Sequence, residues 1–381
     1  MPSVAASSSS NIKYLHRQYC LSDGFDPGWT GKDNFPSKPD QKTVQINLQD
    51  GEAVIGTLHT YAAQPLFQLA LFVVANAVMI WRLHAMEGKG FEGTVLGTLI
   101  MPYCSGFANL AFAYVMSSSA GNGGAVIENC IVNNTTNLTF ILGMSALFGT
   151  AAILPQKRTK AEQKRHAEFS RINRLNLLLT LIAMFLFTGT LWALANDKKL
   201  DVYDGLILIG LFLFWQILHV FEVQKDSIRK ERSFHWSITI DLALIAACAY
   251  GIYFSVDHLV DWVATTNNPL FSFARIGWFS GILMVLPNAF IALYYAWIGR
   301  QDIVISSQIG DGHICIPMCI GLFSVFNTIQ IPDSFLTGIY VIAGAGAVIF
   351  LSIAALGRIP RPVGAGLIGA YAYFLYTGLI Q

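Results

Sequence analysis

Polar residues that can bind a cation or a proton stand at helical spacing inside two long apolar stretches. Asn129, Asn133 and Asn137 follow one another at i, i+4 and i+8, so in an α-helix their side chains fall on one slowly drifting stripe. The second stretch repeats this spacing with Ser307, Asp311 and Cys315. Such groups are costly in hydrocarbon unless they face protein or water. We expect the two stripes to line a former or present ion pathway; the alternative is that the asparagines only hydrogen-bond helices together.

The two stripes belong to a segment that the chain contains twice. Its copies run from Ser105 to Gly143 and from Met284 to Gly321. Asn109 corresponds to Asn288 at an offset of 179 residues; at an offset of 178, the matched pairs are Asn133 with Asp311, Asn137 with Cys315, and Gly143 with Gly321. A polar row repeated in two halves of a membrane protein is typical of a transporter built from inverted repeats.

The composition indicates an integral membrane protein. Hydrophobic residues make up 54% of the chain and charged residues 12%, with a mean hydropathy of +0.51, whereas a soluble domain carries about 25% charged residues. The net charge of +1 gives no reason to expect nucleic acid as a partner. The sequence has no HExxH, no nucleotide-binding loop and no convincing Ser/His/Asp set, so we expect no enzyme and no cofactor.

Apolar runs of spanning length predict an all-α polytopic protein with ten transmembrane helices. They fall near 64–82, 95–117, 124–153, 175–195, 203–221, 236–255, 275–298, 303–329, 335–356 and 362–380. The two copies occupy the second and third spans and the seventh and eighth, which divides the ten into five plus five. An odd number of helices per half inserts the second half upside down, so the predicted symmetry is that of two inverted five-helix repeats.

The basic residues predict how the protein sits in the bilayer. With the N-terminus outside, the inside loops hold 16 of the 24 Lys and Arg residues. The positive-inside rule therefore places both termini on the non-cytoplasmic side. The membrane itself remains unspecified.

Six segments follow from the spans and from the charged stretches between them. They are an N-terminal extramembrane tail (1–61), helices 1–3 of the first repeat (62–155), a basic inside linker (156–174), helices 4–5 (175–222), a second basic linker (223–235) and the inverted second repeat (236–381). The tail contains Tyr14, Tyr19, Phe25, Trp29 and Phe35. So many aromatic residues suggest that it packs on the membrane domain or on a protein partner.

These motifs resemble the two alpha-repeats of the calcium/cation antiporter superfamily, which includes the sodium/calcium exchangers. That family shows roughly G-T-S-x-P-E on one helix and D-I-A-L-G-N-x-x-G-S-N-x-x-[ND] on the next. The second copy matches with Leu286-Pro287-Asn288 and with 299–311, and the first with Ala108–Ala111, Ala125–Asn129 and Asn133–Asn137. The resemblance covers about residues 62–380 and implies an exchanger-like fold.

The resemblance also implies which residues would meet the ion. These candidates are Ser105, Asn109, Asn133, Asn137, Asn288, Asp311 and Cys315. In the family a glutamate on each first repeat helix dominates the site, but Asn109 and Asn288 stand at those two positions. Asp311 is then the one charged member, and calcium usually takes six to eight oxygens with several carboxylates. We therefore expect a monovalent cation or a proton rather than calcium.

Four further residues are secondary candidates: Glu128, Asn129, Asp302 and Ser307. For Glu128 and Asp302 we favour the simpler interpretation that they stabilise helix N-termini.

Three function classes remain open, of which a membrane enzyme or receptor is the least favoured. One is a cation antiporter with altered selectivity. Another is a transport-inactive homologue that serves as a structural subunit or scaffold of a larger membrane complex. This class would explain both the absence of the two glutamates and the presence of the aromatic tail.

Overall fold

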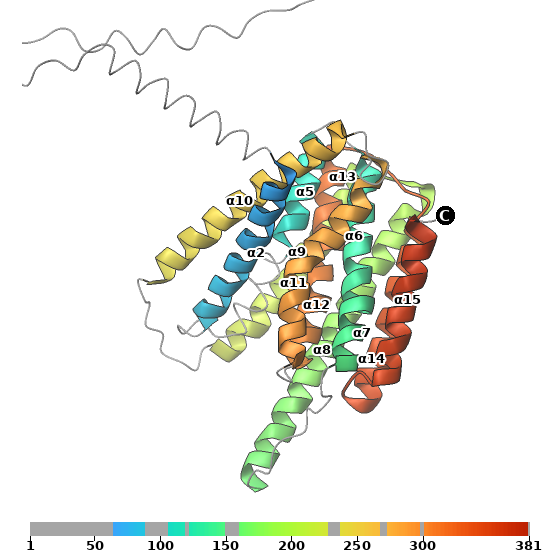
Figure 1. Cartoon of the computed structure of the whole chain (residues 1–381). Helices are drawn as coiled ribbons and strands as arrows, with labels where there is room; N and C mark the ends of the chain where they lie inside the picture. Colours follow the sequence, from blue (N-terminus) through green and yellow to red (C-terminus); the bar gives the residue numbers. More distant parts are fainter. Residues whose placement is uncertain are drawn as a thin grey trace, which may run out of the picture. The chain divides into compact units, whose positions relative to one another are not determined.

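The structure is a computed structural model that describes residues 64–87, 106–118, 122–148, 160–227, 237–266, 273–297 and 301–379. All of them belong to one compact unit, Leu58–Gln381, which is a bundle of helices (Figure 1). The N-terminal tail lies outside the described residues, so its packing and its partner stay predictions.

The first half of the bundle ends at Ser227. Its helices are α2 (Pro65–Glu87), α5 (Phe107–Ser118), α6 (Gly123–Thr135), the π-helical turn η2 (Thr136–Ile141), α7 (Leu142–Phe148), α8 (Lys160–Leu194), the 3-10 turn η3 (Ala195–Asp197) and α9 (Val202–Ser227). A short strand, β1 (Lys199–Leu200), lies between η3 and α9. Helices α6, η2 and α7 follow without a break and form one rod.

The second half contains α10 (Ser237–Thr265), the 3-10 turn η4 (Phe273–Arg275), α11 (Ile276–Trp297), α12 (Gln301–Ile314), the π-helical turn η5 (Cys315–Ile320), α13 (Gly321–Phe326), α14 (Phe335–Leu356) and α15 (Arg361–Leu379). Strand β2 (Ile329–Gln330) precedes α14. Helices α12, η5 and α13 again form one rod.

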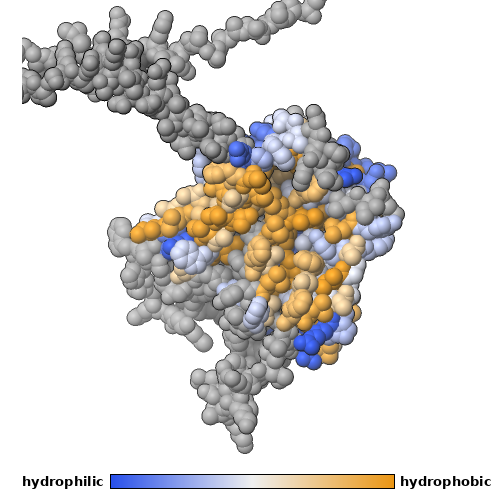
Figure 2. All heavy atoms as spheres, in the orientation of Figure 1, coloured by the Kyte–Doolittle hydropathy of each residue, from blue (hydrophilic) through white to orange (hydrophobic). Residues whose placement is uncertain are grey.

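Six helical stretches among the described residues are long and apolar enough to cross a membrane. They are Pro65–Arg82, Arg174–Asp197, Thr239–Thr265, Phe273–Phe290, Val304–Phe326 and Phe335–Leu356, and two shorter apolar helices are Phe107–Ser118 and Val202–Leu218. Large apolar side chains cover much of the visible bundle surface, as Figure 2 shows in orange. This is the surface expected of an integral multi-pass membrane protein.

Two helices extend beyond the hydropathy prediction by ten residues or more. Helix α8 begins at Lys160, so 160–174, which we expected as a linker, continues the helix that we placed at 175–195. Its 35 residues correspond to about 52 Å at 1.5 Å per residue, which exceeds the roughly 30 Å hydrocarbon core. Helix α10 runs ten residues beyond the predicted end at 255 because Asp257, His258 and Asp261 lower the local hydropathy without stopping the helix.

The two rods pack in matching ways. The α6 rod packs against α11, α14 and α15, while the α12 rod packs against α5, α8 and α9. Backbone approaches tightly at two glycine pairs. A Cβ on Gly364 would lie 2.8 Å from the carbonyl oxygen of Gly143, and a Cβ on Gly205 would lie 2.7 Å from that of Gly321. Gly143 and Gly321 are the matched glycines of the duplicated segment, so each rod uses the same position to contact a neighbouring helix.

The two ends of the bundle differ in charge. At one end β1 and β2 pair antiparallel, with Lys199 opposite Gln330, and the adjoining sequence contains Asp197, Asp201, Asp204 and Asp333. At the other end, the turn between α14 and α15 contains Arg358 and leads into Arg361. Arg174 of α8 lies at this end too, because its guanidinium donates to the carbonyl oxygen of Ala354.

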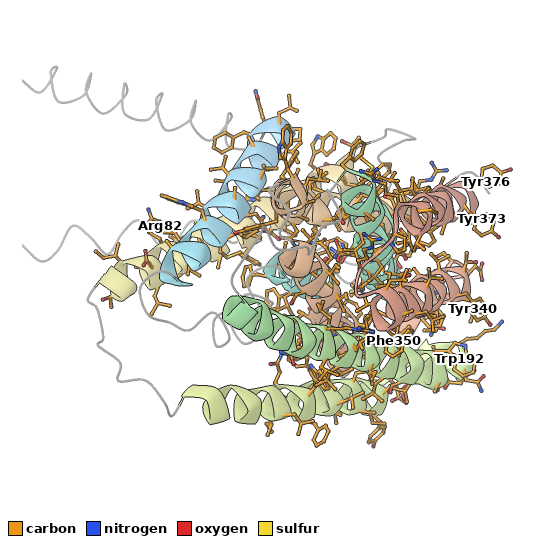
Figure 3. All side chains as sticks on the ribbon, turned by 90° about the horizontal axis from the view of Figure 1, so that it is seen from below. Arg82, Trp192, Tyr340, Phe350, Tyr373 and Tyr376 are labelled. Atoms are coloured by element: carbon orange, nitrogen blue, oxygen red, sulfur yellow. The ribbon has the colours of Figure 1, made fainter. Side chains whose placement is uncertain are left out.

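Aromatic side chains lie near the end that carries the strands. Trp192, Tyr340, Tyr373 and Tyr376 are each half exposed or more, and Figure 3 shows them at the outer side of α8, α14 and α15. Tyr and Trp are enriched where a membrane protein passes from lipid to water. Their position indicates one membrane–water boundary near the strand-bearing end.

Candidate cation site in the centre of the bundle

A network of buried amides surrounds one buried carboxylate where the two rods meet in the centre of the bundle. Asn133 and Asn137 come from the α6 rod, Asp311 from α12, Asn109 from α5 and Asn288 from α11. Each of these five side chains is buried. Five of the seven principal candidates therefore converge, from two pairs of neighbouring helices that lie far apart in the sequence.

Hydrogen bonds link the five residues in an unbroken chain. Asp311 Oδ2 accepts from Asn288 Nδ2 at 2.6 Å and from Asn137 Nδ2 at 3.4 Å. Asn137 also donates to Asn133 Oδ1 at 3.1 Å, and Asn133 donates to Asn109 Oδ1 at 3.4 Å. The carboxylate is thus held by amide donors from both copies of the duplicated segment.

Cys315, the sixth principal candidate, joins the network through sulfur. Its thiol donates to Asn133 Oδ1 at 3.6 Å, so that oxygen accepts from two directions. Cys315 is fully buried. Ser105, the seventh, lies outside the described residues.

A π-helical turn begins within four residues of the polar centre in each rod. Turn η2 starts at Thr136 and contains Asn137, and η5 starts at Cys315, four residues after Asp311. Pro317 lies in η5 and has no backbone N–H, so it cannot complete the α-helical ladder there. In the other rod, the hydroxyls of Thr136 and Thr139 donate to carbonyls one turn back. Such turns are rare and often mark functional sites.

Asn129 anchors the α6 rod to α11 rather than joining the central chain. Its Nδ2 donates to Ser280 Oγ at 2.9 Å and lies 3.3 Å from Met284 Sδ. The helices approach closely there because α11 has Gly277 and Gly281 at the contact, where an added Cβ would lie 2.6 and 2.8 Å from carbonyl oxygens of α6. Small residues at i and i+4 bring membrane helices together in this way.

The other secondary candidates lie away from the network or cannot be placed. Glu128 accepts from Ser334 Oγ at 3.3 Å, next to the start of α14. It therefore lies near the end of the bundle and not in the central network. Ser307 Oγ donates to the carbonyl oxygen of Val304 in its own helix. Asp302 falls in the first turn of α12, and its side chain lies outside what the structure describes.

The structure adds residues that we did not select from the sequence. Asn134 is buried, donates to the carbonyl oxygen of Cys130 at 2.7 Å, and its Oδ1 lies where a Cβ on Gly312 would approach within 2.6 Å. Gln308 is buried one turn before Asp311. The sequence shows that Asn134 and Gln308 are polar and lie next to the candidate residues. Only the packing of the helices shows that both face inward.

Some buried oxygens in this region accept no hydrogen bond. They are Asn137 Oδ1, Asn129 Oδ1 and Gln308 Oε1. An unpaired buried acceptor costs on the order of 1–3 kcal/mol, and a bound cation or hydrogen-bond donor would remove this cost. Across the described ranges, no group of three or more His, Cys, Asp or Glu residues is placed to hold a metal ion.

Comparisons with known proteins bear on the fold that holds this network. Residues 63–221 match the family described as "Sodium/calcium exchanger protein". The match covers the first of the two rods and its asparagine stripe.

Solved structures of a sodium/calcium exchanger share the fold. One is the sodium-calcium exchanger NCX_Mj soaked with sodium and strontium, with 20% identity and a TM-score of 0.56; the match covers 82% of this chain and 97% of that one. NCX_Mj soaked with sodium and calcium gives 18% identity and a TM-score of 0.54, covering 82% and 96%. The same exchanger without either ion gives 18% and 0.55, again covering 82% and 96%. No curated protein matches the chain significantly.

These likenesses confirm that the chain resembles a sodium/calcium exchanger in its helical fold. They span both rods of this chain, since more than four-fifths of it is covered. At this level of identity they establish the fold alone, so the ion has to be argued from the residues of this site.

Proposed function

We propose that this chain is a secondary cation transporter of the exchanger fold whose central site binds a monovalent cation or a proton at Asp311. The observation that carries the proposal is one buried carboxylate held by amides from both copies of the duplicated segment. A carboxylate inside a membrane bundle is expensive, and such residues usually mark an ion or proton path.

The charge balance favours a single positive charge. A divalent ion in a low-dielectric site needs more than one anionic ligand, or the replacement of its water by many oxygens. Here Asn109 and Asn288 stand where the family has glutamates, and the amides add neutral oxygens only. One carboxylate is neutralised by one proton or one monovalent cation. Acceptors without donors, such as Asn137 Oδ1, can complete the ligand shell of that cation.

The architecture belongs to the same proposal. We infer ten transmembrane helices in two inverted five-helix repeats, with both termini on the non-cytoplasmic side. The matching glycine contacts of the two rods support the repeat, and the basic α14–α15 turn supports the orientation, since basic loops favour the cytoplasmic side. The segment boundaries follow our sequence interpretation, except that the first basic linker is treated as the cytoplasmic extension of α8.

A second function is favoured by a specific observation: two oxygens at the centre of the network already accept from two donors of the protein itself. Asn133 Oδ1 accepts from both Asn137 and Cys315, and Asp311 accepts from two amides. Oxygens that are already paired have less to offer an ion. A transport-inactive homologue that serves as a structural subunit would use the same network as interhelical glue, and the N-terminal tail would then provide a contact to a partner.

Flux measurements distinguish the two functions. Purified protein is reconstituted in sealed liposomes, and sodium, potassium, calcium and proton gradients are imposed one at a time. A transporter of the proposed kind dissipates a monovalent or proton gradient, and Asp311→Asn abolishes that flux. Ser307→Ala is the matched control, because Ser307 lies one turn away on the same helix and bonds only within that helix in the contacts given above. Flux equal to that of empty liposomes under every gradient would support the scaffold instead.

A further inference from the structure

Three thiols lie together beside the central network. Cys130 comes from α6, and Cys315 and Cys319 come from η5, which packs against α6. Each thiol has the other two as hydrogen-bond neighbours, and all three side chains are fully buried. They are three of the four free cysteines among the described residues. Sulfur atoms from both halves of the chain thus meet at one place, which we call the thiol cluster.

The thiol cluster is continuous with the candidate cation site. The thiol of Cys315 donates to Asn133 Oδ1 at 3.6 Å, and Asn133 is linked through Asn137 to the carboxylate of Asp311. In the duplicated segment, Cys315 also occupies the position that Asn137 has in the first copy. A cation that reaches the carboxylate therefore has sulfur ligands next to it, in addition to the oxygens of the amides.

The chemistry of sulfur identifies the class of cation. Thiolates are soft ligands that select copper(I), whereas hard cations such as calcium take oxygen. Burying extra charge in the bundle is costly, but a thiol releases its proton when a metal ion binds. One copper(I) then replaces one proton, so the net charge of the cluster does not change. A monovalent soft cation binds two sulfurs in a line, so it does not need a group of three metal ligands, which the described residues do not provide.

The contacts of the three thiols indicate which two bind the ion. Cys315 already donates to Asn133, whereas the side-chain neighbours given for Cys319 are the other two thiols. We propose that Cys130 and Cys319 bind one copper(I) ion, or another soft monovalent cation, between the two halves of the bundle. The alternative is that the cysteines only pack as small apolar residues. Binding does not require transport, so the flux assay and the copper assay can fail independently.

Competition for copper(I) tests the proposal. Purified protein in detergent is titrated without oxygen into the coloured complex of copper(I) with bicinchoninate, and the loss of absorbance measures the copper that the protein takes up. Every protein carries Cys20→Ser and Cys104→Ser, because these two cysteines lie outside the described residues. We expect uptake of one copper ion per chain. Cys130→Ser and Cys319→Ser should each weaken binding at least about tenfold, as the loss of even a supporting partner does in metal sites.

Two matched controls use the remaining thiols. Cys248→Ser removes the free cysteine of α10, and Cys315→Ser removes the cluster thiol that is bonded to Asn133; both should leave copper binding unchanged. Circular dichroism and elution volume confirm that each variant is folded. The proposal is overturned if the protein takes no copper from bicinchoninate, if Cys248→Ser or Cys315→Ser loses as much affinity as Cys130→Ser, or if excess sodium or potassium displaces the copper.

Discussion

Asn288 donates a 2.6 Å hydrogen bond to Asp311, and the two residues lie 23 positions apart on neighbouring helices of the same half. It is the shortest of the bonds that hold the carboxylate in the central network. In the exchanger pattern that the sequence resembles, a glutamate stands at this position, so here an amide donor takes the place of a second negative charge. The donated hydrogen bond partly compensates the buried charge of Asp311, and this arrangement leads to the first two predictions.

Removing the charge of Asp311 should separate function from stability. Asp311→Asn keeps the size of the side chain, and one of its oxygen positions can still accept from Asn137 or Asn288. We expect flux of the transported cation to fall by at least about tenfold, because a buried charge is worth more than 1.4 kcal/mol to a bound cation, while the thermal unfolding midpoint stays within a few degrees. A variant that unfolds markedly but transports normally would contradict the role assigned to Asp311.

Restoring carboxylates should create a calcium site. The wild-type protein is expected to show no micromolar calcium binding in calorimetry, because one carboxylate is too few for a divalent ion. Asn109→Glu/Asn288→Glu places three carboxylates around the same centre and should bind calcium measurably. The control Asn176→Glu adds a carboxylate at an exposed position of α8 and should bind none. Micromolar binding by the wild type, abolished by Asp311→Asn, would show that our charge argument is wrong.

The paired glycine contacts predict matched losses of stability in the two halves. Gly205→Ala and Gly364→Ala each force a methyl group against a carbonyl oxygen of the opposing rod, at 2.7 and 2.8 Å. Overpacking of this kind costs roughly 1–3 kcal/mol. Gly210→Ala and Gly366→Ala lie on the same helices with nothing within 4 Å, and they should be neutral or slightly stabilising because alanine favours helix. Thermal unfolding in detergent measures all four; clearly unequal losses from the first two would weaken the case for a repeat.

The orientation can be tested with protease. In sealed right-side-out vesicles, the predicted outside tail should be cleaved within residues 1–60 without permeabilisation. Permeabilising the vesicles exposes a tail on the inner side, whereas an outside tail shielded by a partner becomes cleavable only in the purified monomer. A tail that is protected in the vesicles and equally protected in the purified monomer would instead indicate packing on its own membrane domain.

The sequence predicted the helices better than their ends. The predicted span 335–356 coincides with α14, Phe335–Leu356, because its apolar run stops at a glycine in the left-handed conformation and no charge interrupts it. The extents of α8 and α10 were underestimated, since Lys160–Arg174 and Asp257–Asp261 are polar yet helical. Hydropathy reports where a helix meets lipid and cannot report where its backbone hydrogen bonds stop.

The sequence predicted which residues lie together in the candidate site, but it did not predict the hydrogen bonds between them. The spacing of Asn133 and Asn137 and the duplication indicated that they would meet Asp311. The choice of Asn288 as its nearest donor, and the attachment of Asn129 to Ser280, depend on side-chain rotamers and on how closely α11 packs. The π-helical turns depend on local backbone register, for which Pro317 was a signal in one rod and nothing comparable stood in the other.

The hydrogen bonds between the two halves in the centre of the bundle have a consequence for the synthesis of the protein. Asn137 finds Asp311 174 residues later in the chain, and Asn129 finds Ser280 151 residues later. At roughly 5–20 residues per second, a ribosome needs on the order of 10 to 35 seconds to supply Asp311. During that interval the α6 rod exists with its amides unmatched by the second half. Until then, contacts within the first half alone, such as the bond between Asn133 and Asn109, have to keep these amides away from lipid.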